Sequence, residues 1–316
     1  MGQPKRTLRL AGLGLTGLGL GGLGAAALGP PIWAQAAGST TWKFEGKLGA
    51  EYNSNVAVSD LDTNTGQGDW AATINLNAEV IYKPTGKAML RGGYDFSQSL
   101  YQEFDAFNLA IHRGYAEAAY DFDAATVGVL GNYAQANLDG DKYLTYQQVS
   151  PYVSKQFGDA VFLRGAYAYT DKTFKGRADR DAKSNALQAD AYFFLDGVSR
   201  YITVGVKGTK EDATGPEFDY KSGTYKARFT QRFNAFNDEL TFRAGVEYED
   251  RDYDNVTPSI SAVRKDKRTV ADAVLEIPLG KHAFSEVSYR YGKYDSNLPS
   301  ADYNEQVGAI RIGLRY

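Results

Sequence analysis

The sequence predicts an all-β fold: a single transmembrane antiparallel up-and-down β-barrel of about 14 strands. Three observations predict it. From Trp42 onward apolar and polar residues alternate in a pattern that recurs about every 20 residues, aromatic residues mark both ends of the apolar faces, and short turns alternate with longer loops. Alternate residues of a strand face opposite sides, so one face can meet hydrocarbon and the other water, while closure of the sheet leaves no backbone edge in lipid.

The first 36 residues form a predicted signal peptide, and residues 37–316 form the predicted barrel. Lys5, Arg6 and Arg9 precede a stretch rich in Leu, Gly and Ala, and Ala34-Gln35-Ala36 offers a small-x-small cleavage site. The density of glycine and the break at Gly29-Pro30-Pro31 argue against a retained membrane anchor. We therefore expect an exported protein.

Composition excludes several classes of protein. No apolar run of about 18 residues lies beyond the leader, which excludes a helical membrane protein. Cysteine is absent, so there is no disulfide framework or thiolate metal site. Loss of the three leader cations from a net charge of −3 leaves −6, which argues against nucleic-acid binding.

The predicted strands follow from the alternation. In the segment WKFEGKLGAEY, Trp42, Phe44, Leu48 and Tyr52 share one face, while lysines and glutamates occupy the other. An even strand number is usual for bacterial barrels. The predicted ranges are 41–57, 69–83, 87–101, 107–122, 125–138, 143–157, 160–171, 184–195, 199–211, 219–233, 238–252, 266–278, 282–295 and 303–316.

Two of these strands fit the pattern poorly. The phase of 107–122 changes around His112 to Gly114, which predicts a β-bulge, and Pro151 removes a backbone donor within 143–157, which predicts a bulge or a shifted boundary.

The connections give the orientation. Turns such as Pro84-Thr85-Gly86 and Asp123-Ala124 are tight, whereas 58–68, 172–183 and 253–265 are predicted to be longer polar loops. Short periplasmic turns and longer external loops are typical of outer-membrane barrels, so both chain ends are expected in the periplasm.

Aromatic residues predict two interfacial girdles, which a soluble β-sandwich or propeller does not need. The final strand ends in Ile310, Ile312, Leu314 and the terminal Tyr316 on one face, and it resembles the C-terminal signature that barrel assembly machinery recognises. We expect that machinery, outer-membrane lipid and lipopolysaccharide as partners. The predicted girdles are Trp42, Tyr82, Phe157, Phe193, Phe233 and Tyr316 near the turns, and Tyr52, Trp70, Tyr133, Tyr169, Tyr225, Tyr248 and Tyr291 near the loops.

Charged residues on the inward faces are the candidate site. They can filter solutes in a narrow polar pore, or pair with one another and brace an inert barrel, and the nearly balanced signs leave both interpretations open. Fourteen strands lie between the filled eight-stranded barrel and the open sixteen-stranded porin. We expect loop 253–265 to be able to fold inward and narrow the lumen. The candidate lumen-lining residues are Lys43, Glu45, Lys47, Glu51, Glu79, Arg91, Asp95, Arg164, Asp190, Lys226, Arg228, Arg243, Glu247, Glu286, Arg290, Arg311 and Arg315, together with Asp272 and Glu276.

We expect no enzyme, cofactor or metal. Of the two histidines, His112 lies inside a strand and His282 at a turn, so neither suits a hydrolase at the external rim. The segment from Asp60 to Gly66 is faintly similar to a calcium-binding loop, but its glycine comes one place late and a glutamate at the twelfth position is missing. A solvated loop is the expectation there.

Several stretches resemble the barrel of the surface lipoprotein assembly modulators and related 14-stranded proteobacterial barrels. They are GAEYNSN (49–55), FNLAIHRGYAEAAYDF (107–122) and the last 28 residues (289–316). The resemblance implies a barrel that helps lipoproteins or soluble cargo reach the cell surface. Family members usually carry a periplasmic domain of tetratricopeptide helices before the barrel, and we expect none here.

Three functional hypotheses follow. The first is a passive, porin-like pore for small polar solutes. The second is an export or surface-display barrel that acts with a periplasmic partner or a lipoprotein cargo, and the third is a surface-interaction barrel that uses its loops.

Overall fold

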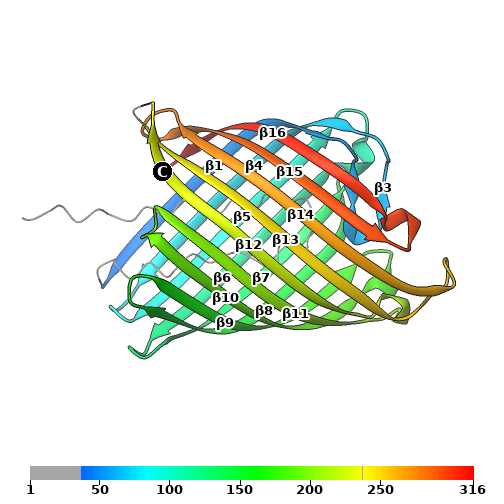
Figure 1. The fold of residues 1–316 in the computed structure, drawn as a ribbon, viewed down its shortest axis with the longest axis horizontal. Coiled ribbons are helices and arrows are strands. Elements are labelled where there is room, and N and C mark those ends of the chain that lie inside the picture. The colour runs from blue at the N-terminus through cyan, green and yellow to red at the C-terminus, as the bar shows by residue number, and fades with distance from the viewer. Residues whose placement is uncertain (1–36, 237) are drawn as a thin grey trace, which may run out of the picture.

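The chain forms a closed barrel of 14 antiparallel strands in a computed structural model that describes residues 37–236 and 238–316 (Figure 1). The predicted signal peptide, residues 1–36, lies outside the described residues. In barrel order, starting from the first strand and passing to the last, the strands are β1 (Ser39–Asn53), β16 (Tyr303–Arg315), β15 (Ala283–Ser296), β14 (Ala262–Pro278), β13 (Asp238–Thr257), β12 (Tyr220–Ala235), β11 (Arg200–Ala213), β10 (Ala182–Asp196), β9 (Val161–Phe174), β8 (Asp141–Phe157), β7 (Thr126–Leu138), β6 (Leu109–Asp121), β5 (Ala88–Tyr101) and β4 (Asp69–Lys83).

The sheet closes where the first and last strands pair. The register of β1 with β16 runs from Glu45 opposite Arg315 to Asn53 opposite Val307. Phe44 and Tyr316 extend it, because each backbone N–H donates to the other's carbonyl oxygen, at 3.1 and 2.9 Å. No edge of the barrel sheet is left over, so the predicted 14-stranded barrel is confirmed.

The two ends of the barrel differ. One end carries the short connections and the C-terminus, and the other carries most of the longer ones (Figure 1). We call them the turn end and the loop end. Two connections at the loop end depart from the predicted alternation. Asp139 and Gly140 alone join β7 to β8, both with positive φ, as a two-residue hairpin requires. β13 and β14 extend far into the predicted loop 253–265, so only 258–261 connects them.

The predicted β-bulge in β6 is wrong, since the strand keeps an unbroken register with β5 and β7. Leu109 and Ile111 face inward, in phase with Arg113, and they are buried against residues of the loop end. The alternation of apolar and polar residues changes phase in this strand because these apolar side chains face the lumen.

Pro151 introduces no bulge either. The ladder between β8 and β9 skips Ser150 and Pro151 and resumes in the same register at Tyr152. The bulge of β8 lies nearer its start, where the register with β7 shifts between Ala136 and Asn137. β8 thus accommodates Pro151 by losing its pairing with β9 over one short stretch.

The outer surface carries the aromatic residues that the alternation assigned to it. Trp42, Phe157 and Tyr316 are exposed near the turn end, and Trp70 and Tyr225 are exposed near the loop end. In the described part of the chain, none of the helical segments has the length and apolar character needed to cross a membrane.

The longest connection, residues 54–68, has a fold of its own, and we call it the first loop. It contains the short strands β2 (Ala57–Val58) and β3 (Thr63–Asn64), which pair with each other, and the 3-10 turn η2 (Ser59–Leu61) between them. Val56 and Gln67 close its base through a 3.0 Å backbone hydrogen bond. Four other 3-10 turns lie at the loop end: η3 (Asp105–Phe107), η4 (Ala178–Arg180), η5 (Pro216–Phe218) and η6 (Pro299–Ala301).

Candidate functional site: the inner wall and the mouth of the barrel

The inner wall carries a belt of ion pairs, to which most of the predicted site residues contribute. Lys43 donates to Glu79 at 2.7 Å, and Arg91 lies between Glu79 and Glu117. On the opposite side Lys226 pairs with Asp190 and Arg228 with Asp272. Similar pairs join Asp95 to Arg113, Arg243 to Glu276, Arg290 to Glu305, and Arg315 to Glu45 and Glu276.

These ion pairs follow the circumference of the wall. Among the described residues, each ion pair between barrel strands joins strands that are neighbours or that have one strand between them; none crosses the lumen. Long charged side chains that lie flat along the wall satisfy one another without bridging its centre. The pairs therefore connect nearby strands of the sheet, and none of them spans the barrel axis.

The densest part of the belt lies at the seam between the first and last strands. Arg311 of β16 binds Glu51 of β1 and Glu286 of β15, and Lys47 of β1 reaches the same Glu286 at 3.1 Å. Arg311 also donates to Ser288 at 3.0 Å. Three strands are thus tied together by groups that are largely hidden from water.

Two predicted residues have other surroundings. The guanidinium of Arg164 lies over the ring of Tyr152, 4.2 Å from its centroid, which is a cation–π arrangement. Glu247 lies near the positive charges of Lys207, Lys226 and Arg228 and near the negative charge of Glu249. The role of any of these residues in passing solutes stays a prediction.

Several wall residues that the sequence analysis did not name belong to the same belt. Arg113 and Glu117 were hidden by the assumed bulge in β6. The others continue the alternation of the predicted strands, and following the period of two along each strand would have found them, since all but Lys172, one residue beyond 160–171, lie inside the predicted ranges. They are Lys172, Glu211, Glu249, Arg251, Asp266, Arg268 and Glu305.

The strip formed by β7 and β8 differs, because its inward residues are uncharged. Asn132 donates to Gln148 at 3.3 Å, and Gln148 donates to Tyr146 and to Thr170 of β9. Toward the loop end the strip becomes apolar. Its buried inner residues there are Ala134, Ala136, Leu144 and Tyr146.

The first loop folds inward onto that apolar strip. Val58 is only 3% exposed, because it packs in one cluster with Leu109, Ile111, Leu144 and other side chains of β6 to β9. Leu61 of the same loop contacts this cluster as well. The apolar inner residues of these strands therefore have a partner in the first loop, which is held on this side by burial.

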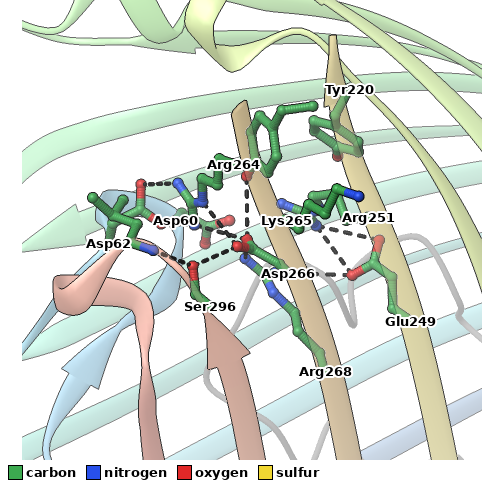
Figure 2. A network of polar contacts seen from close by, with 12 residues as sticks. Asp60, Asp62, Tyr220, Glu249, Arg251, Arg264, Lys265, Asp266, Arg268 and Ser296 are labelled. Carbon is green, nitrogen blue, oxygen red and sulfur yellow. Dashed lines mark hydrogen bonds and ion pairs between the residues drawn. The ribbon is translucent and has the colours of Figure 1, made fainter. Parts of the chain in front are cut away.

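The other side of the first loop is held by charge. Asp62 accepts two hydrogen bonds from Arg264 of β14, at 2.9 and 2.7 Å (Figure 2). It accepts a third from Arg180 of η4, at 2.7 Å. β14 lies three strands from β1 in barrel order, and β9, which precedes η4, lies five strands from β4. A single carboxylate from the first loop thus joins two distant parts of the rim.

A wider network supports Arg264. Asp266 accepts from Arg264 at 2.9 and 2.8 Å and from Ser296 of β15 at 2.7 Å, while Glu249 binds Arg251 at 3.1 Å (Figure 2). Arg268 lies within 4 Å of both Asp266 and Glu249. Together with Arg180 of η4, four arginines meet at this point.

The charge of Asp62 is strongly stabilised. Burial opposes ionisation of its carboxyl group, but the hydrogen bonds and positive charges of Arg264 and Arg180 outweigh burial and hold the pKa of Asp62 well below its ordinary range. Asp62 is therefore ionised at neutral pH.

Two expectations are corrected here. The loop that folds inward is the first loop and not 253–265, because β13 and β14 keep pairing and carry that segment away as a hairpin. The segment from Asp60 to Gly66 is not a solvated loop, because Asp62 is buried in the arginine network and Val58, just before it, is buried in the apolar cluster. Val58 and Asp62 contact residues that are distant in sequence, so the residues around them show no pattern that predicts these contacts.

The model of one protein family matches residues 42–314, which is nearly the whole barrel. Its description is surface lipoprotein assembly modifier. The chain belongs to this family. The resemblance seen in the sequence is thus confirmed. Among curated proteins, none matches the chain in sequence.

Solved structures similar to this family member are outer-membrane barrels. OmpT of Vibrio cholerae, folded in vitro in its trimer form, has a TM-score of 0.51 at 12% identity, covering 88% of this chain and 100% of that one. An anion-selective porin from Comamonas acidovorans has a TM-score of 0.50 at 9% identity, covering 88% and 99%. At these identities the likeness concerns the fold alone. Together with the family, it makes this chain an outer-membrane β-barrel.

Proposed function

We propose that this barrel takes part in the assembly of lipoproteins at the cell surface, as a conduit that the first loop keeps closed at rest. The family match over residues 42–314 carries the proposal. The turn end would face the periplasm and the loop end the exterior, as in other outer-membrane barrels. Cargo or a periplasmic partner would then enter where the chain ends lie.

The mouth supports a conduit that opens only when used. Val58 fixes the first loop to β6 through β9, and Asp62 fixes it to η4 through Arg180 and to the distant β14 through Arg264. The wall itself presents no ion pair across the lumen in the described part of the chain. Displacement of one loop would therefore clear the passage without repacking of the barrel.

Deletion of the gene in its own host tests this proposal. Surface exposure of the host's lipoproteins, measured by protease shaving of intact cells, should fall on deletion and recover with the wild-type chain. A matched control is the chain carrying Asp212→Asn, which alters an exposed ion pair with Lys210 on β11. Unchanged exposure of every lipoprotein on deletion would refute the role.

A second candidate function is passive passage of small polar solutes. It is favoured by the balanced, circumferential ion pairs, which leave a polar wall around the axis. Planar-bilayer recording of the refolded barrel separates the two functions. A steady conductance in the wild type, unchanged when residues 57–65 are replaced by a Gly-Ser linker, would support the pore; conductance only after that replacement would support the closed conduit.

A further inference from the structure

Asp62 sits in the rim as a ligand would sit in an anion site. Within the described structure, Asp62 is the one residue of the first loop whose carboxylate is bound by two guanidinium groups. Both guanidinium groups belong to other parts of the rim. Arg264 donates to both carboxylate oxygens of Asp62, and Arg180 donates a third hydrogen bond, which Oδ2 accepts. A two-pronged guanidinium contact of this kind matches any carboxylate or phosphate group.

The arginines are held in place by partners other than Asp62. The guanidinium of Arg180 lies over Phe218, 4.4 Å from the ring centroid, and that of Arg264 lies over Tyr253 at 4.7 Å. Asp266 holds Arg264 from the side away from the first loop (Figure 2). Stacking on an aromatic face keeps a guanidinium planar and oriented. Arg180 also donates to the carbonyl oxygen of Asp60 at 2.9 Å. Release of the first loop would therefore free a second donor of Arg180 and leave its contact with Phe218 to orient it.

The charge balance of the network favours an anion. Without the first loop, the ion-pair network contains Arg180 and the three arginines Arg251, Arg264 and Arg268, together with two carboxylates, Glu249 and Asp266. The adjoining pair of Lys172 and Glu211 is neutral by itself. The Nε of Arg180 is, in addition, buried without a hydrogen-bond partner in the described structure. Removal of Asp62 would leave two excess positive charges in a largely buried place, which is costly unless another anion enters.

We propose that Arg180 and Arg264 form an oxyanion-binding site for a carboxylate or phosphate group, which Asp62 fills as an internal occupant when the mouth is closed. An external oxyanion and Asp62 compete for the same two guanidinium groups. Binding of the ligand is therefore linked to release of the first loop, and each favours the other by the same factor. This inference goes beyond the proposed function and holds for either kind of conduit.

The experiment uses the absence of cysteine from the chain. The full barrel carrying Val58→Cys is refolded in detergent, and the rate at which a maleimide labels this buried position reports release of the first loop. Inorganic phosphate at 50 mM should raise the labelling rate about 10-fold, because it competes with Asp62. Sodium chloride at equal ionic strength should raise it far less. Equal acceleration by both salts would overturn the proposal, since screening alone would explain it.

Direct binding gives a second measurement. Asp62→Asn keeps the shape of the side chain and removes its charge, so calorimetry should show phosphate binding at least 10-fold tighter than in the wild type. Addition of Arg180→Gln and Arg264→Gln to that variant should abolish it. Asp212→Asn, a matched loss of charge in the exposed pair with Lys210, should leave phosphate binding at the wild-type level. Heat-modifiable migration on gels confirms that each variant is folded. Tight phosphate binding that persists in the triple variant would overturn the proposal.

The source of the oxyanion is resolved by changing the probe. Sodium acetate tests a carboxylate, inorganic phosphate a free phosphate, and micelles doped with lipopolysaccharide a lipid-borne phosphate. The proposal expects at least one of them to accelerate labelling of Val58→Cys in the wild-type background and not in the Arg180→Gln, Arg264→Gln background. Failure of all three would overturn it.

Discussion

Arg311 on the last strand and Glu51 on the first strand form an ion pair across the seam that closes the barrel, with 2.8 Å between Nη2 and Oε2. Arg311 also binds Glu286, so a single guanidinium serves carboxylates on both neighbouring strands. Both members of the seam pair are nearly hidden from solvent. Closure of the sheet and neutralisation of the wall therefore depend on the same side chain.

We expect Arg311→Met to destabilise the barrel by about 3 kcal/mol, because it leaves two carboxylates without their shared partner. Urea unfolding, followed by intrinsic fluorescence in detergent, measures the loss. Arg311→Met combined with Glu51→Gln should recover part of it, since one orphaned charge is removed. Equal stability of the single variant and the wild type would show that the seam pair is not needed.

Gly49 should be irreplaceable at the same seam. A β-carbon there would lie 2.2 Å from the carbonyl oxygen of Ile310 and 2.6 Å from the side chain of Arg311. We expect Gly49→Val to prevent closure, detected as loss of the heat-modifiable folded band on gels. Gly46→Ala, whose β-carbon would meet only Leu76 at 3.4 Å, is the matched control and should fold.

Charge introduced into the apolar contact should free the first loop. Val58→Asp places a carboxylate in the cluster of β6 to β9 without a partner, which costs several kcal/mol. We expect the mouth to open and the bilayer conductance to rise several-fold above that of the wild type. Gln67→Glu adds the same charge at an exposed position of the loop and should change little. A conductance equal to that of the wild type in Val58→Asp would contradict inward closure by this loop.

Closure should be insensitive to pH over the neutral range. The pKa of Asp62 is lower in the closed mouth than in a free loop, where it is about 3.9. The stabilisation is therefore complete above about pH 5 and is lost only as the pH falls through the lower, closed-state value. We expect conductance to stay constant from pH 8 to pH 5 and to rise only well below pH 4. A rise between pH 7 and pH 5 would contradict an Asp62-based closure.

The barrel and its strands could be predicted from the sequence because membrane strands obey one local rule. Lipid imposes a period of two on each outward face, so the ranges of β4 (69–83) and of most other strands were predicted to within about two residues, as were the outward positions of Trp42 and Trp70. The rule fails at the loop end, where strands leave the hydrocarbon. There β13 continues to Thr257 with polar residues on both faces.

The mouth could not be predicted for a different reason. Leu109 and Ile111 face inward because Val58 covers them, and Asp62 is ionic because Arg180 and Arg264 reach it from more than a hundred residues away. The period of two reflects whether a face of a strand meets lipid or water. At the loop end the inner faces contact another part of the chain instead, and the period of two does not identify such a contact. The sequence therefore indicated a charged wall but not the loop that closes it.

The 202 residues that separate Asp62 from Arg264 have a consequence for biogenesis. Asp62 belongs to the connection between the first two barrel strands, whereas Arg264 arrives with the twelfth of the fourteen. Until both segments have joined one barrel, the acidic tip lacks its principal counter-charge. The contact that we propose closes the mouth therefore belongs to the finished barrel, and no shorter piece of the chain that lacks β14 can form it.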